Sequence, residues 1–468
     1  HQEATYGPGL LRVAGAPVQR GWEELQAAAE AYNGAGPGQG LVTILGSEAG
    51  SLAPIAGHMN SYYLDPDNRP ELERLGLTRE NRVGIFPLDQ DPAVLYRRYL
   101  NELERSKGEV LLLPHAHACG GPGKFELPKR PAYQTNVEIC SVHGVFEEFY
   151  RQWLAHGHLV GVHGSGDNHM TSTGHGNPGY HYPNTNGLMA AVAPVCSRRA
   201  IWDAIRERQT YAVTGNQRIH LDFAVNGEAM GTVVAAEGTP RAVHVEVAGT
   251  APVMRVDLYR NNVVIRTYEP PLSRWDHLRL AWTDSWGSRR VDDSMTTGTI
   301  AVDGAALEVV DRLHMYHRTD RIEADPDGAQ VSWQTNGYSG ITRGAIVRLM
   351  SAETPSHSLR FQIHDEHLDE VVLDTAIEVP LDRRRAVIEQ PLDAPERARR
   401  PCFTREPSQP TFTLEADWID PDWPKVVTLD WVDDDRTPAF YYVRVEQIDG
   451  NIAWSSPVWF VAARGAGS

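Results

Sequence analysis

The pattern of apolar residues changes near residue 218, and this change constrains the possible folds more than any other feature of the sequence. Before it, apolar runs of strand length alternate with segments of helical periodicity, whereas after it strand patterns follow one another. Repeated strand and helix units favour a parallel sheet or barrel, and successive short strands favour a β-sandwich. We therefore expect an α/β domain over 1–217 and a β-sandwich-like region over 218–468, which could divide into 218–272 and 273–468.

Individual elements can be predicted within this division. Ser197 is a candidate N-cap for a helix over 198–208, and Asn261-Asn262 and Asp449-Gly450 are candidate hairpin turns. Further helices are predicted over 22–32, 92–106 and 146–155, and strands over 41–45, 83–88, 110–113, 137–141, 159–162 and 210–214.

Histidines and carboxylates gather in the Gly-rich breaks of the first half. Asp167 and His169 lie in Gly161-Val162-His163-Gly164-Ser165-Gly166-Asp167-Asn168-His169, where a D-x-H pair beyond a strand can direct both side chains toward one ion. Other members also follow predicted strands, and in barrels this rim carries the active site. Because imidazole and carboxylate suit zinc, manganese or iron, we predict a metal site with the ligands Glu48, His58, His115, Asp167 and His169.

Other polar residues near these motifs are candidates for catalysis or support. His143, His117 or His163 could protonate a leaving group. Of Glu138 and His143, one could ligate or orient substrate while the other supports it, and a structural hydrogen bond explains Glu138 equally well. His163, His175 and His181 lie in or near the loop 164–186, which suits a substrate-facing lid as well as plain solvent exposure.

Composition and missing motifs exclude several classes of function. A net charge of -17 provides no basic surface for a phosphate backbone, so nucleic acid is not expected as a partner. No transmembrane segment is predicted, because no run approaches the roughly 20 consecutive apolar residues that a spanning helix needs. The sequence contains neither a G-x-S-x-G elbow nor a Walker-type loop. A glycosidase using Glu48 and Asp167 would leave the surrounding histidines without a role.

At these residues the chain resembles the polymerase and histidinol phosphatase, or PHP, superfamily of metal-dependent phosphoesterases, in particular a bacterial branch described as a domain of unknown function. The resemblance covers most of the chain. The matching stretches are Gly46-Ser47-Glu48, Gly57–Tyr63, Pro114-His115, Val137-Glu138-Ile139 with His143-Gly144, Gly166–His169, Arg208–Gly215 and Ala453–Pro457.

The resemblance implies a distorted (β/α)7 TIM-like PHP barrel that holds up to three metal ions, followed by the β-sandwich-like region. It assigns the same five ligands as the residue pattern does. The family's opening H-x-H motif is absent, and the T-D-H motif that follows it survives at most as His1, which becomes a sixth ligand candidate. We expect from this that the barrel is N-terminally incomplete, with a lost segment or a separate chain completing it, or that the site is depleted.

These observations predict a metal-dependent hydrolase in which two or three divalent ions activate a bridging water. A small-molecule phosphate ester is the substrate that the resemblance implies, although the same water could attack an amide, lactone or carboxylic ester. A noncatalytic binding protein is the alternative from another class. The chain begins at His1 without a signal-like segment, and the four cysteines show no C-x-x-C pair, so cytoplasmic and periplasmic or secreted locations both stay open.

Overall fold

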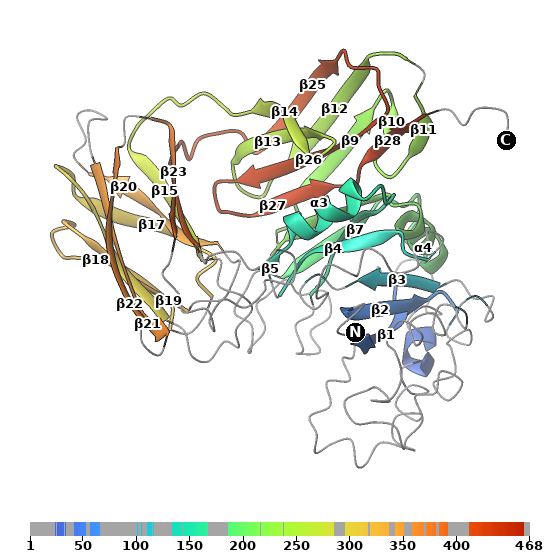
Figure 1. Ribbon diagram of the computed structural model, residues 1–468, viewed down its shortest axis with the longest axis horizontal. Coiled ribbons are helices and arrows are strands. Elements are labelled where there is room, and N and C mark those ends of the chain that lie inside the picture. The colour runs from blue at the N-terminus through green and yellow to red at the C-terminus, as the bar shows by residue number, and fades with distance from the viewer. Residues whose placement is uncertain are drawn as a thin grey trace.

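The computed structural model contains an N-terminal α/β region and two β-sandwiches (Figure 1). All structural statements below concern the residues that the structure describes. These are 24, 26–31, 33, 42–52, 57–65, 101, 104, 110–114, 116, 133–142, 144–166, 186–215, 217–236, 238–284, 295–316, 319–336, 342–350, 358–368, 371–380, 383–391 and 411–462.

The α/β region contains two small sheets. The first is an antiparallel sheet in the order β1-β2-β3, formed by β1 (Leu45–Leu52), β2 (Gly57–Tyr63) and β3 (Val110–Pro114). The second has the order β5-β4-β6, and the helix α3 leads from β5 to β6. Its elements are β4 (Asn136–Ser141), β5 (Gly144–Val145), α3 (Glu147–Ala155) and β6 (Gly161–Gly164).

The prediction of a distorted (β/α)7 TIM-like barrel is wrong. Such a barrel needs successive parallel strands joined by crossover helices. In the described part of the chain, β4 and β6 do pair in parallel, but β1, β2 and β3 form an antiparallel meander. The strands that flank α4 (Arg198–Arg206), which are β7 (Gly187–Ala191) and β8 (Thr210–Thr214), also pair antiparallel.

The first β-sandwich, called the host sandwich here, combines strands from the middle and the end of the chain. One sheet has the order β10-β9-β12-β25, and the other contains β11-β28-β26-β27-β8-β7, with β13 paired to β26 and β14 paired to β13. The elements not yet given are β9 (His220–Val225), β10 (Glu228–Ala229), β11 (Val233–Ala235), β12 (Arg241–Ala248), β13 (Val253–Arg260), β14 (Val263–Tyr268), β25 (Val426–Asp433), β26 (Ala439–Gln447), β27 (Ile452–Ser455) and β28 (Val458–Val461).

The second β-sandwich, called the insert sandwich here, lies between β14 and β25 in sequence. Its two sheets have the orders β17-β20-β15-β24-β23 and β18-β19-β16-β21-β22. Its strands are β15 (His277–Asp284), β16 (Met295–Val302), β17 (Leu307–Leu313), β18 (Arg321–Ala324), β19 (Val331–Asn336), β20 (Arg343–Leu349), β21 (Ser358–Leu368), β22 (Val371–Pro380), β23 (Arg385–Pro391) and β24 (Thr411–Ile419).

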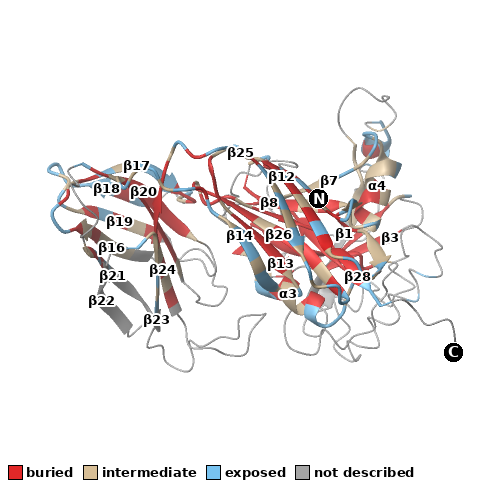
Figure 2. Ribbon diagram, turned by 90° about the horizontal axis from the view of Figure 1, so that it is seen from above, coloured by how far each residue is buried: buried red, intermediate tan, exposed pale blue. Residues whose placement is uncertain are grey.

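Alternating apolar residues of facing sheets build a separate core in each sandwich (Figure 2). In the host sandwich, β12 contributes Val243, Val245 and Val247, which are at most 2% exposed, while its intervening residues face outward. Trp282, Trp333 and Phe361 lie among the central side chains of the insert core. Fully burying one such large side chain contributes about 1.5–3 kcal/mol, so these alternating strands stabilise the sandwiches mainly through apolar burial.

The predicted caps and turns are confirmed where the structure describes them. Ser197 caps α4, because its hydroxyl accepts a hydrogen bond from the backbone N–H of Ala200 at 3.2 Å. Asn261 and Asn262 have φ angles of 50° and 65°, the left-handed backbone of a tight turn between β13 and β14. Gly450, with φ 79°, turns the chain between β26 and β27. None of the helices in the described ranges combines the length and apolarity needed to cross a membrane.

A buried polar junction attaches the α/β region to the host sandwich. The Thr210 hydroxyl, at the start of β8, donates to the carbonyl of Val162 at 2.8 Å. It also lies 3.1 Å from Asn136 Oδ1 and 3.0 Å from Ser456 Oγ. The Ser456 hydroxyl in turn accepts from the backbone N–H of Val162 at 3.0 Å. One hydroxyl therefore joins β4, β6, β8 and the segment between β27 and β28.

We predict that Thr210→Val destabilises the protein by about 1–3 kcal/mol, because an isosteric side chain leaves these buried polar groups without their shared partner. Thr428→Val is the matched control, since Thr428 is exposed on β25, and its effect should stay within about 0.5 kcal/mol. Urea unfolding of both variants measures the difference. Equal effects of the two substitutions would contradict the role of the Thr210 junction.

Candidate functional site

The sheet containing β4 and β6 has one apolar face and one polar face. Val137 and Ile139 of β4 and Val162 of β6 pack with α3 in a core that also includes Tyr442 and Trp454 of the host sandwich. Glu138 and His163 are paired in register on the two parallel strands, so alternation places both on the opposite face. Ser165 follows two residues after His163. These three side chains are all buried, at 2%, 7% and 9% exposed.

The carboxylate of Glu138 joins the two segments in which sequence analysis places metal ligands. Its Oε2 atom accepts a hydrogen bond of 2.9 Å from the backbone N–H of Ala116, which lies between His115 and His117. Its Oε1 atom accepts one of 2.7 Å from the hydroxyl of Ser165, two residues before Asp167. The end of β3 and the end of β6 are therefore held at one carboxylate.

Backbone contacts fix the end of β6 on both sides. The N–H of Ser165 donates to the carbonyl of Cys140 at 3.0 Å, and the N–H of Gly187 donates to the carbonyl of Ser165 at 2.8 Å. This close approach depends on Gly164, because a Cβ atom there would lie 2.4 Å from the carbonyl oxygen of Leu188. The chain thus enters the Asp167 segment from a rigidly placed strand end.

His163 occupies the middle of the polar face. Its Nδ1 atom lies 3.2 Å from the sulfur of Met189 on β7, and its ring is 6.3 Å from the ring of Tyr62 on β2. The α/β region therefore places an imidazole between its two sheets, beside the pair formed by Glu138 and Ser165. An imidazole can both donate and accept a proton, which is the chemistry that a general acid requires.

The strand β1 carries Glu48 and β2 carries His58, and the backbone register relates them to β3. Glu48 pairs with Asn60, and Asn60 pairs with Leu113 of β3. Met59, which follows His58, pairs with Pro114, the residue directly before His115. The expectation that Glu48 follows a strand end is wrong, because β1 extends to Leu52. The strands that carry Glu48 and His58 and the strand that directly precedes His115 nevertheless lie side by side in one sheet.

Most of the predicted site residues lie outside the described residues. For Glu48 and His58 the structure describes the backbone, and for Glu138 and His163 it describes the side chains as well. Within the described ranges, no group of three or more His, Cys, Asp or Glu side chains is arranged to hold a metal ion. The ligand set therefore stays a prediction. The positions outside are His1, His115, His117, His143, Asp167, His169, His175 and His181.

Ser165 is the functional candidate that sequence reasoning missed. The signal was available, because Ser165 lies two residues after His163 and strand alternation assigns both to one face. For its partner Glu138 the sequence leaves three roles open, namely ligating or orienting substrate, supporting the site, or a structural hydrogen bond, and the structure shows that it contacts Ala116 and Ser165. The neighbouring Cys140 is not a nucleophile candidate, since burial and then the charge of Glu138 raise the pKa of its thiol well above the usual value.

Comparisons with known proteins do not assign the chain to a family. No family model matches it. An uncharacterized protein of Chlamydia trachomatis serovar D is 31% identical over 96 residues, which are 19% of this chain and 15% of that protein. An uncharacterized protein of Chlamydia muridarum is 30% identical over 96 residues, with the same coverage of 19% and 15%. The chain thus matches less than a fifth of the length of either relative.

We predict that Glu138→Ala lowers the free energy of unfolding by about 1–3 kcal/mol, because the buried N–H of Ala116 and hydroxyl of Ser165 lose their acceptor. Glu148→Ala, at an exposed position of α3, is the control and should change it by less than about 0.5 kcal/mol. Chemical denaturation gives both values. A wild-type unfolding midpoint for Glu138→Ala would show that the carboxylate does not hold the two segments.

Proposed function

We propose that the protein is a metal-dependent hydrolase whose site lies at the ends of β3 and β6. The observation that supports this most directly is the Glu138 carboxylate, which binds the backbone between His115 and His117 and the hydroxyl two residues before Asp167. Two segments far apart in sequence, each rich in potential ligands, are thereby brought to one place. Ala116 lies directly between two imidazole side chains, and Ser165 lies two residues after His163 and two residues before Asp167.

The donor set fits divalent transition metals. His58, His115 and His169 offer imidazole nitrogen and Glu48 and Asp167 offer carboxylate oxygen, the ligands that zinc, manganese and iron accept. We propose two or three such ions, which when bound lower the pKa of a coordinated water toward neutrality. In this arrangement Glu138 is a positioning residue, because it acts through the segments that it holds.

In this proposal Glu138 and Ser165, His163, and the apolar layer behind the sheet each have a separate role. Glu138 and Ser165 fix the distance between the two ligand segments, so the site needs little rearrangement on binding. His163 is placed on the same buried face and can hold a proton for the leaving group. The apolar layer of Val137, Ile139 and α3 behind the sheet excludes water from the back of the site.

A small-molecule phosphate ester is the substrate class that we propose to test first, on the resemblance of the sequence motifs to metal-dependent phosphoesterases. Amide, lactone and carboxylic ester bonds are open to the same activated water and form the second arm of the screen. A noncatalytic binding protein would show none of these activities. The screen and the metal content together separate the three alternatives.

We predict that the purified protein contains transition metal and that Asp167→Ala or His169→Ala removes most of it and lowers turnover by about 100-fold or more. Asp222→Ala on β9 and His156→Ala at the end of α3 are matched controls, because both side chains are exposed and lie outside the proposed site. Elemental mass spectrometry, chelation and readdition of metal, and circular dichroism are measured on each variant.

The outcomes of this experiment are distinct. Loss of metal and turnover in a folded Asp167→Ala protein supports the hydrolase, and the substrate screen then identifies the bond that is cleaved. Wild-type protein that contains no metal and cleaves no phosphate ester, amide, lactone or carboxylic ester would contradict the proposal and favour a binding protein. Unchanged metal content in both ligand variants would show that the ions bind elsewhere.

A further inference from the structure

The insert sandwich contacts the host sandwich through strand faces that point away from its own core. On β15, Leu278, Leu280 and Trp282 face the insert core, and the alternate residues Arg279 and Ala281 face the junction. The apolar part of the junction contains Met254 and Ile448 from the host strands and Ala281, Leu313, Ile346 and Ile419 from the insert.

Arg279 is shared between two carboxylates at this junction. Its guanidinium lies 3.3 Å from Asp417 on β24, within the insert, and 2.8 Å from Glu446 on β26, in the host. The side chains of all three residues are at most 8% exposed. One contact of Arg279 thus stays inside the insert, while the other crosses to the host sandwich.

The crossing contact continues to the α/β region. Glu446 also pairs with Arg444 at 2.7 Å, and Arg444 pairs with Glu147 at 2.8 Å. Glu147 is the first residue of α3, two residues beyond β5. A chain of ion pairs therefore runs from Arg279 in the insert through β26 to the helix that covers β4 and β6.

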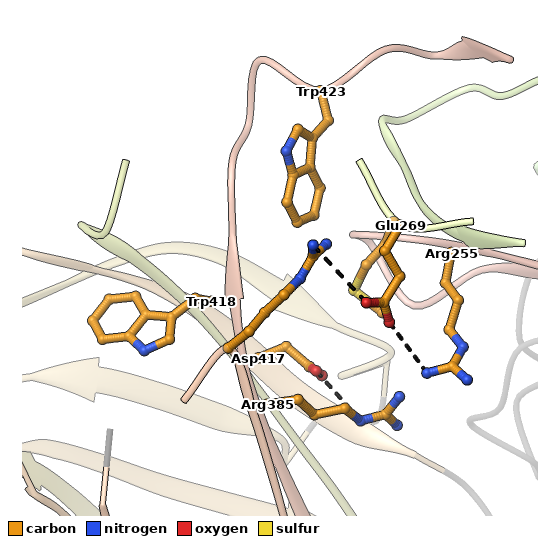
Figure 3. Close-up of a pocket in the computed structure, with 8 residues that line it drawn as sticks. Arg255, Glu269, Arg385, Asp417, Trp418 and Trp423 are labelled. Atoms are coloured by element: carbon orange, nitrogen blue, oxygen red, sulfur yellow. Dashed lines mark hydrogen bonds and ion pairs between the residues drawn. The ribbon is translucent and has the colours of Figure 1, made fainter. Parts of the chain in front are cut away.

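Other charged groups surround Asp417 from the neighbouring strands. Arg385 on β23 lies 3.4 Å from it and also pairs with Glu415 on β24 at 3.1 Å. Figure 3 shows Arg385 beside Asp417 in a small pocket at the junction, with the separate ion pair of Arg255 and Glu269 opposite. The charges of Arg279, Arg343 and Asp449 also act on the buried imidazole of His314.

The two carboxylates that share Arg279 differ in how readily they take up a proton. Burial raises the pKa of Asp417 to about 6, although Arg279 and Arg385 act in the opposite direction. Burial also opposes ionisation of Glu446, but Arg444 and Arg279 outweigh it and lower its pKa to about 2. Between these two values Asp417 is neutral while Glu446 keeps its charge.

We propose that this junction is a pH-sensitive clamp: when Asp417 takes up a proton from solvent, Glu446 remains the nearest charged partner of Arg279, and the insert sandwich is held more firmly on the host. The geometry carries this inference, because one buried guanidinium has an internal and a crossing partner. The inference does not depend on the proposed hydrolase activity.

The direction of the effect follows from linkage. A carboxyl whose pKa is higher in the docked protein than in the open state binds more protons when docked, so docking strengthens as the pH falls through about 6. His314 contributes in the opposite direction, because burial lowers its pKa to about 4. The docked protein disfavours the protonated imidazole, so protonation of His314 weakens docking as the pH falls. A test must therefore separate Asp417 from His314.

The experiment measures how often the junction opens. The four native cysteines, Cys119, Cys140, Cys196 and Cys402, are first replaced by alanine. Ala281→Cys then places a single thiol at a junction position that is 1% exposed. The rate of thiol labelling at each pH, divided by the rate in unfolded protein, gives the equilibrium constant for opening of the junction. Asp417→Asn in the same background mimics the protonated carboxyl. Because His314 is unchanged in both proteins, the ratio of their opening constants isolates Asp417.

We predict that the opening constant of the parent protein, divided by that of Asp417→Asn, falls about tenfold between pH 8 and pH 5. Glu446→Gln should raise opening at both pH values because the crossing contact loses its charge. Glu323→Gln is the matched control, since Glu323 is exposed on β18, on the other sheet of the insert sandwich from Arg279 and Asp417, and it should leave the profile unchanged.

A second variant keeps the test decisive if Asp417→Asn does not fold. Arg385→Gln removes a cation that favours the Asp417 carboxylate, so the pH midpoint of opening should move upward relative to the parent protein. A ratio that is constant from pH 8 to pH 5, an unmoved midpoint in Arg385→Gln, or equal opening in Glu446→Gln and Glu323→Gln would each overturn the clamp.

Discussion

The pairing of β8 with β27 is the interaction on which the rest of the structure depends. It brings residues 211–213 next to residues 453–455. The host sandwich can therefore form only when almost the whole chain is present. The same contact brings Ser456 to Thr210 and Val162, which anchors β6 below the host sheet. The placement of the candidate site thus follows from a strand pairing near the end of the sequence.

This dependence explains which parts of the fold could be predicted. The strand at 110–113, the helix at 146–155, the Ser197 cap and the Asn261-Asn262 turn rest on local patterns, and the structure confirms them. Alternation of such elements predicts a parallel sheet or barrel, and the resemblance implies its (β/α)7 form, but alternation does not determine whether neighbouring strands run parallel. Pairing of β8 with β27 and of β2 with β3 involves distant segments, and the local pattern contains no information about those partners.

The candidate site divides in the same way. Glu138 is recognisable in the sequence because it is a polar residue between the apolar residues Val137 and Ile139 of one strand. Strand alternation assigns its side chain to the sheet face opposite to theirs. The sequence could not show that its two oxygens would bind Ala116 and Ser165, because hydrogen bonds of this kind depend on how β3 and β6 are placed. His115, Asp167 and His169 lie outside the described residues, so the ligand set stays a prediction.

The ion pairs at the junction between the two sandwiches have a different physical role from the apolar cluster beside them. Taking Arg279, Asp417 and Glu446 out of water costs several kcal/mol per ion before their attraction offsets it, so they are weak evidence for stability. The apolar cluster around Met254 and Ile448 can hold the insert against the host without them. The charges instead specify the orientation of the insert on the host, because the Arg279 guanidinium reaches both Asp417 and Glu446 in one orientation. Since the same chain of pairs ends at Glu147, that orientation is also linked to the start of α3 and, through β5, to the strand that carries Glu138.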